Sequence, residues 1–218
     1  MHIPDGMIAP QAYLVATALA VPAWAWGARC IRRDFDERCI PRLAVLTALA
    51  FVLQGIMLPL PGGSSAHLLG LGVLVLGVGL WPAFIAYSIV LALQAVLLGA
   101  GGITALPVNA LAMGLAGGAV MALGHRLLAP RLAATRFEPL ATVIPVWLGL
   151  VVAALAIALV LGVQPLLAVD AAGQPLFFPF GPAVTLPVIV IPHVLIGLLE
   201  GLLAWLVLTR LPLRVVPA

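Results

Sequence analysis

The first two residues, Met1 and His2, offer a metal ion three nitrogen atoms without any folding. These are the Met1 α-amine, the His2 backbone amide and the His2 imidazole. The amine and amide nitrogens close a five-membered chelate ring, and the amide nitrogen and imidazole Nδ1 close a six-membered ring. With the amide deprotonated, the nitrogens lie near one plane, and such coordination favours Ni(II) or Cu(II). The alternative is an ordinary start residue followed by a surface histidine.

The residues that follow stiffen this start of the chain. Pro4 fixes one φ angle and removes a backbone donor, and Asp5-Gly6 is typical of a turn. We therefore expect residues 1–9 to form a metal-binding arm. We also expect Met1 to be retained, because His2 is too large for the aminopeptidase that removes initiator methionines before small residues.

A second histidine, His67, follows a loop of small residues that includes Ser64 and Ser65. The glycines and serines of the loop over residues 61–68 let it re-enter a protein-lined cavity and satisfy its own backbone. Because imidazole suits nickel and cobalt, His67 is the natural fourth nitrogen for the chelate. The alternative is a helix-capping loop with an interfacial histidine.

Three further polar residues interrupt apolar sequence at Gln94, Thr104 and Asn109. Amide side chains at membrane depth face the interior of a helix bundle and seek partners there. We expect the three to converge on the layer that holds His67, where they would hold an imidazole in the correct tautomer. Simple contacts between helices are the alternative.

His193 and Glu200 lie seven residues apart in one apolar stretch, so they share one face of a helix. An ionisable group in a membrane span is costly and by default suggests a function. Glu200 would pair with His193 through water, or with an arginine at the inner rim. The alternative is a buried charge that sets the register of the helix.

The elements that must position these residues are membrane helices. The chain is 64% hydrophobic and 8% charged, which is too apolar for a soluble domain, and we predict one all-α transmembrane bundle over residues 1–218. Seven hydrophobic segments are expected, at residues 10–28, 41–60, 67–81, 82–99, 103–124, 139–163 and 185–209. The third of these segments is short, and it meets the fourth at a tight joint, Trp81-Pro82.

All ten positive side chains are arginines, and they follow the first, fifth and seventh segments. Basic loops stay in the cytoplasm, so this pattern predicts an outer N-terminus, a cytoplasmic C-terminus and an odd number of crossings. The net charge of +3 therefore reflects topology and gives no support to nucleic-acid binding. The arginines are Arg29, Arg32, Arg33, Arg38, Arg42, Arg126, Arg131, Arg136, Arg210 and Arg214.

Several motifs of the chain, and the order in which they occur, resemble those of one family. This family is the substrate-binding membrane subunits (S components) of energy-coupling-factor (ECF) nickel/cobalt importers. The resemblance covers nearly the whole chain. The motifs are Met1-His2-Ile3-Pro4-Asp5-Gly6, Gly63-Ser64-Ser65-Ala66-His67-Leu68, Gln94 through Asn109 with Met113-Gly114, and His193…Gly197…Glu200-Gly201. Two departures, Ser64 where the family often has threonine and Pro107 where a glycine is common, remove no ligand.

The resemblance implies a seven-helix fold, with an extra N-terminal helix added to a six-helix core. It implies that Met1, His2 and His67 hold the metal, and that the substrate is Ni(II) or Co(II), with no separate cofactor. The expected partners are a transmembrane coupling subunit, two cytoplasmic ATPases and, in some systems, a small accessory membrane subunit. The expected location is the cell membrane of a prokaryote.

The chain is expected to be a transporter subunit and not an enzyme. It contains no Gly-x-x-x-x-Gly-Lys-Ser/Thr motif for ATP hydrolysis. An intramembrane hydrolase built on Ser64 or Ser65 with a histidine is one alternative, and a membrane scaffold without a ligand is another. The residues leave open whether nickel or cobalt is preferred.

Overall fold

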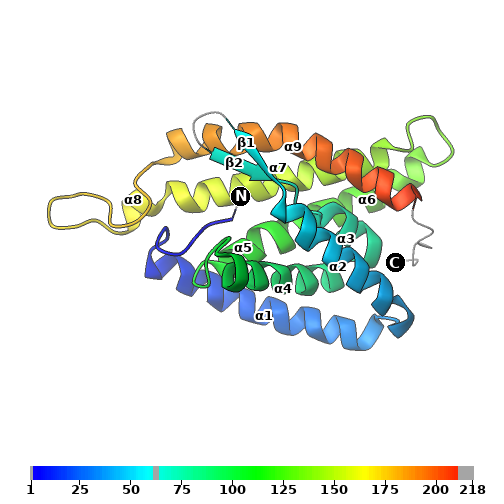
Figure 1. The fold of residues 1–218 in the computed structure, drawn as a ribbon, viewed down its shortest axis with the longest axis horizontal. Helices are drawn as coiled ribbons and strands as arrows, with labels where there is room; N and C mark the ends of the chain where they lie inside the picture. The colour runs from blue at the N-terminus through cyan, green and yellow to red at the C-terminus, as the bar shows by residue number, and fades with distance from the viewer. Residues whose placement is uncertain (1, 61–63, 211–218) are drawn as a thin grey trace.

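The computed structural model describes residues 2–60 and 64–210, and it is built almost entirely of helices (Figure 1). The helices are α1 (Pro10–Asp34), η1 (Glu37–Cys39), α2 (Ile40–Gly55), α3 (Leu71–Val78), α4 (Leu80–Leu98), α5 (Leu106–Asn109), η2 (Ala110–Gly117), α6 (Gly118–Leu132), α7 (Leu140–Gly162), α8 (Gln164–Leu167) and α9 (Pro182–Arg210). One hairpin, of β1 (Met57–Leu60) and β2 (Ser64–His67), joins α2 to α3.

Within the described ranges, six helical stretches are long and apolar enough to cross a membrane. The all-α class is therefore confirmed, with six candidate spans where the sequence suggested about seven. Large apolar side chains remain exposed along these helices, as a multi-pass membrane protein requires where lipid replaces water. The stretches are Pro10–Asp34, Glu37–Gly55, Leu80–Leu98, Leu106–Leu132, Leu140–Leu167 and Pro182–Arg210.

The third predicted segment, 67–81, is not among these six stretches, in keeping with its shortness. Its helix α3 has 8 residues, which rise about 12 Å, less than half of the ~30 Å hydrocarbon core, and residues 80–81 already belong to α4. The joint to α4 also differs from the one predicted at Trp81-Pro82. It lies at Gly79, whose φ of 89° favours glycine, while Pro82 sits in the first turn of α4, where a missing N–H is tolerated.

The second predicted segment, 41–60, is also too long. Helix α2 ends at Gly55, and the apolar residues after it form β1. The antiparallel register pairs Met57 with His67. The hairpin therefore returns the chain to the end of α2 and leaves His67 beside it.

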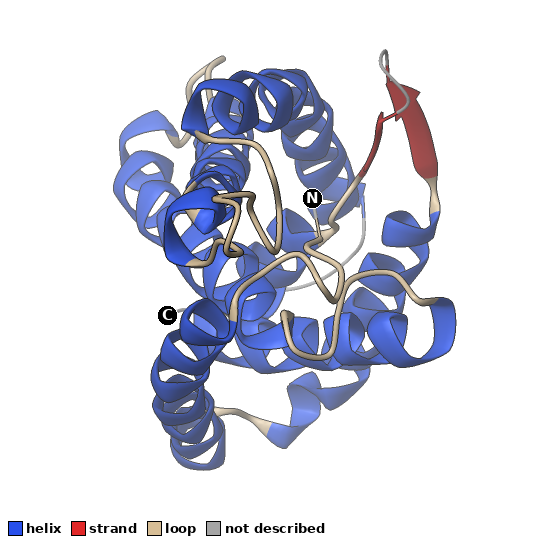
Figure 2. Ribbon diagram, turned by 90° about the vertical axis from the view of Figure 1, so that its left-hand side faces the viewer, coloured by secondary structure: helices blue, strands red, loops and turns tan. Residues whose placement is uncertain are grey.

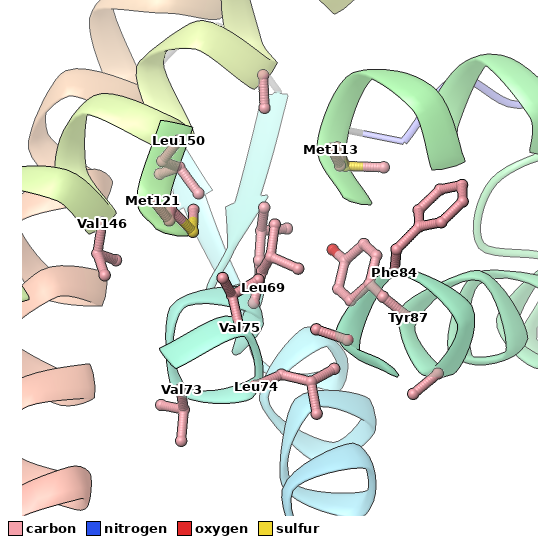
Figure 3. Close-up of a cluster of buried hydrophobic side chains, with 14 of the residues drawn as sticks. Leu69, Val73, Leu74, Val75, Phe84, Tyr87, Met113, Met121, Val146 and Leu150 are labelled. Atoms are coloured by element: carbon pink, nitrogen blue, oxygen red, sulfur yellow. The ribbon is translucent and has the colours of Figure 1, made fainter. Parts of the chain in front are cut away.

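The core is built around the short helix α3, which packs against α2, α4, α6 and α9. Figure 3 shows this cluster, with Leu69 between Phe84 and Tyr87 of α4 on one side and Val146 and Leu150 of α7 on the other. These side chains are fully buried. The segment that follows His67 is thus held firmly inside the bundle.

The two ends of the bundle differ in character. The basic residues that close α1, α6 and α9 lie at one end (Figure 1). The N-terminal arm enters at the other end and reaches the middle of the bundle, as the view in Figure 2 shows. Any site on the arm is therefore remote from the arginines.

Candidate functional site

The N-terminal arm is anchored first through the backbone of Ile3. Its N–H donates to Oδ1 of Asn109 at 3.0 Å, and its carbonyl accepts from Nδ2 of Asn109 at 3.1 Å. Ile3 is fully buried, and Asn109 is 2% exposed. One amide side chain from the end of α5 thus pairs with both polar groups of one arm residue, which fixes the position of the neighbouring His2.

A second anchor is the carboxylate of Asp5. It accepts hydrogen bonds from the backbone N–H groups of Ile103 and Thr104, at 2.9 and 2.8 Å, and from the Thr104 hydroxyl. The Thr104 hydroxyl is the main reason that the pKa of Asp5 lies below its usual value. The contact requires Gly102, because a Cβ there would overlap the backbone nitrogen of Asp5.

The far end of the arm is held as well. The N–H of Ala9 donates to Oε1 of Gln164 on α8 at 2.8 Å, and the carbonyl of Met7 accepts from the N–H of Phe178 at 3.2 Å. The described arm is therefore tied to three separate regions of the chain, at residues 103–109, at Gln164 and at Phe178, all of them distant from the arm in sequence.

The anchored arm brings His2 against His67. Their ring centroids are 4.7 Å apart, with the ring planes tilted by 46°. The Nδ1 of His67 lies 3.3 Å from the carbonyl oxygen of Leu68; since a carbonyl only accepts, Nδ1 carries the proton, and Nε2 is left with a free lone pair. The sequence predicted these two histidines as ligands of one metal, and the structure brings them together.

Both imidazoles are kept neutral by their surroundings. Burial is the main cause, because it disfavours the charged form; it lowers the pKa of His67 to about 3 and the pKa of His2 well below its usual value. Charge on His67 would lower the pKa of His2 further, whereas the nearby side chain of Gln54 raises it. Neutral imidazole is the form that binds a metal.

Among the described residues, no three His, Cys, Asp or Glu side chains come close enough to share a metal ion. The chelate predicted from the sequence does not depend on a third side chain, because its remaining ligands are backbone nitrogens. Met1, which would supply the amine, lies outside the described residues.

Comparison with known proteins identifies the family. Residues 2–215 match the family described as the cobalt uptake substrate-specific transmembrane region. The chain belongs to this family. The resemblance seen in the sequence motifs is therefore confirmed.

Relatives of this cobalt-uptake family share both sequence and fold with the chain. The fused nickel transport protein NikMN of Rhodobacter capsulatus is 38% identical over 216 residues, which cover 94% of this chain and 61% of that protein. The crystal structure of a truncated transition metal transporter is 35% identical and has a TM-score of 0.90, covering 97% of this chain and 98% of that one. A second crystal structure, of a transition metal transporter, has a TM-score of 0.89 at the same identity.

The other residues predicted for the site have varied positions in this cobalt-uptake family member. Asn109 and Thr104 lie at the arm, where their hydrogen bonds go to the Ile3 backbone and the Asp5 carboxylate. Gln94 is elsewhere: its Nε2 is 3.5 Å from the carbonyl oxygen of Phe51, so it links α4 to α2. The backbones of Ser64 and Ser65 pair within the hairpin.

His193 and Glu200 are both buried on α9, as their spacing predicted, but they have separate partners. The Nδ1 of His193 lies 2.6 Å from the carbonyl oxygen of Ile189, and its Nε2 has no partner among the described residues. His193 is close enough to His67 that its charge would lower the pKa of His67.

The predicted pairing of Glu200 with His193 through water, or with an arginine, stays a prediction, and the bond that the structure describes is to backbone. Its Oε2 accepts from the backbone N–H of Leu69 at 2.9 Å. The carboxylate therefore ties α9 to the segment two residues beyond His67. The other carboxylate oxygen, Oε1, is buried and has no hydrogen-bond partner among the described residues.

Two functional positions were missed by the reading of the sequence. Gln164 anchors the arm, and Gln54, 4% exposed, lies beside the His2 imidazole. Both are amide side chains inside apolar stretches. The rule that selected Gln94 would have selected them too, so the signal was present in the sequence.

Proposed function

We propose that this chain is the substrate-binding membrane component of an importer that captures Ni(II) or Co(II) outside the cell and passes it inward. The observation that carries the proposal is the meeting of His2 and His67, with ring centroids 4.7 Å apart, at the end of an anchored arm. The family description, cobalt uptake, and the nickel transport name of the R. capsulatus relative support it.

The metal would be held by four nitrogens. The Met1 amine, the His2 amide and the His2 Nδ1 would form the two fused chelate rings, and His67 would supply the fourth ligand. Because the Nδ1 of His67 faces the Leu68 carbonyl, Nε2 is the nitrogen that remains for the metal. Four nitrogens near one plane favour Ni(II), and Co(II) accepts the same ligands.

Inward delivery would depend on other subunits. We propose that a transmembrane coupling subunit and two cytoplasmic ATPases drive the release of the metal, with a small accessory membrane subunit in some systems. The chain spans only 61% of the fused R. capsulatus relative. The coupling subunit, the ATPases and the accessory subunit are therefore proposed for this chain and not inferred from that relative.

The basic residues support an orientation. Those that close α1, α6 and α9 lie at the end of the bundle opposite the arm (Figure 1), and basic loops stay in the cytoplasm. We propose that the arm and the hairpin face outward, where an importer first meets its substrate.

Radiolabelled nickel or cobalt uptake tests the function. Cells that produce the chain with its partner subunits should accumulate the metal, and an inactive ATPase should stop the accumulation. In a variant with Cys30 and Cys39 replaced by serine, an impermeant maleimide should label Asp170→Cys and spare Arg131→Cys. Uptake that persists without ATPase activity would reject the importer, and labelling at position 131 would reject the orientation.

Nickel affinity should show a specific pH dependence. Protons compete with metal for each ligand, but burial lowers the pKa of His67 to about 3 and the pKa of His2 well below its usual value, so both imidazoles resist protonation near neutral pH. The amine, with a pKa of about 8, and the amide are then the groups that must release protons. We expect the logarithm of the affinity to rise by about two per pH unit between pH 5 and 7. Competition with a coloured chelator measures it, and a steeper rise below about pH 6.5 would show ordinary histidine titration.

A further inference from the structure

We propose that Gln54 is a positioning residue for His2, and that its side-chain carbonyl accepts the proton on Nε2 of the imidazole. This inference rests on the proposed function. It assigns to the binding of Ni(II) or Co(II) a residue outside the set of ligands.

The chelate requires one particular form of His2. Only Nδ1 can close the six-membered ring with the His2 amide nitrogen, so Nδ1 must be unprotonated and the proton must lie on Nε2. A buried N–H group needs an acceptor. In metal sites, the second ring nitrogen of a ligating histidine almost always donates to a carbonyl or a carboxylate, which sets both the tautomer and the orientation of the ring.

No hydrogen-bond acceptor is assigned to His2 Nε2 among the described residues, and the atom is buried. The carbonyl oxygen of Gln54, Oε1, is buried and unpartnered in the same sense. The structure therefore contains one unmatched donor and one unmatched acceptor at the same site, and joining them breaks no existing bond.

The Gln54 amide is already oriented for this role. Its Nε2 donates to the carbonyl oxygen of Leu69 at 3.2 Å. Because a carbonyl only accepts, this bond assigns the nitrogen and the oxygen of the Gln54 amide. Leu69 is itself held by Glu200 through its N–H. The Gln54 side chain also lies close enough to the His2 imidazole to raise its pKa, the effect expected of an acceptor near the ring.

This arrangement also joins the two ligand-bearing segments. Gln54 is the penultimate residue of α2, and Leu69 lies two residues beyond His67. One side chain therefore bonds the segment that carries His67 and faces the ring of His2. We infer that Gln54 sets the ring of His2 relative to His67 before a metal arrives, in the manner of preorganisation.

The test compares equilibrium Ni(II) affinity in three variants of the purified chain, measured by competition with a coloured chelator. Gln54→Met keeps the length of the side chain and removes the acceptor; we expect its affinity to fall about 10- to 100-fold, the usual effect of losing such a partner. Gln54→Glu keeps an acceptor and should restore the affinity to within about threefold of the wild type.

Gln94→Met is the matched control, because Gln94 is an equally buried amide that links α4 to the same helix, α2. It should bind Ni(II) like the wild type. If Gln54→Met binds like the wild type, or if Gln54→Glu is as weak as Gln54→Met, the positioning role is rejected. A wild-type chain that fails to bind Ni(II) would instead reject the proposed function.

A measurement on the wild type covers the case in which Gln54→Met does not fold. Nitrogen NMR of the metal-free protein labelled with ¹⁵N-histidine reports the tautomer of each imidazole directly, and loss of one signal in His2→Ala assigns His2. The proton of His2 should lie on Nε2, and the Nε2 resonance should shift in Gln54→Glu. A proton on Nδ1, or a resonance indifferent to Gln54→Glu, would overturn the proposal.

Discussion

One residue added ahead of Met1 should abolish tight Ni(II) binding and leave membrane insertion intact. The addition turns the α-amine into an amide, which is a far weaker ligand, and moves the chelate one residue away from His67. The arm has no room to shift in compensation, because both polar backbone groups of Ile3 are bound by Asn109. Binding should therefore fall below detection, while α1, whose sequence is unchanged, still inserts.

Titration calorimetry on purified protein measures this effect, with the yield in the membrane fraction as the measure of insertion. An acetyl group on Met1 should act like the added residue, although it adds almost no bulk. A tag after Ala218 is the control and should leave the affinity unchanged. Tight binding by the N-terminally extended chain would reject the chelate, and with it most of the proposed function.

Replacement of His67 by alanine should have the next largest effect. If four ligands share a binding free energy of about 10–16 kcal/mol, as in structural zinc sites, the loss of one costs about 2.5–4 kcal/mol. That is roughly a hundred- to a thousandfold in affinity. The fold should survive, because His67 ends a hairpin and the core begins beyond it, at Leu69.

His125→Ala is the matched control for His67→Ala. His125 lies on α6, and its Nδ1 bonds the carbonyl oxygen of Ala141 at 2.8 Å, far along the chain from the arm. It should bind Ni(II) normally. Near-normal affinity in His67→Ala would remove His67 from the ligands.

The sequence predicted the long membrane helices well and the short elements poorly. A run of about 20 apolar residues in lipid forms a membrane-spanning helix, because only a helix satisfies all its backbone hydrogen bonds within the segment. The four residues of β1 are equally apolar, but so short a run carries no period that separates strand from helix. Helix α3 is surrounded by protein, so its composition resembles that of a lipid-facing span although it is too short to be one.

The candidate site shows a similar division. The approach of His2 to His67 was expected from the nitrogen ligands that a square-planar metal needs. The partners of Asn109 and Glu200 were not, because each side chain bonds to backbone, and a backbone group has the same chemistry at every position in a sequence. Only the folded structure shows which backbone group lies within hydrogen-bond distance of each side chain.

The anchoring of the arm also sets an order of events during biosynthesis. The ribosome makes the arm before any of the segments that hold it: Asn109 follows Ile3 by 106 residues, and Gln164 follows Ala9 by 155. The arm therefore gains its full set of anchors only after α8 has been made. A chain interrupted before Asn109 carries His2 but lacks the side chain that binds Ile3, so a stalled translation product cannot hold a metal between His2 and His67 in the way we propose for the finished protein.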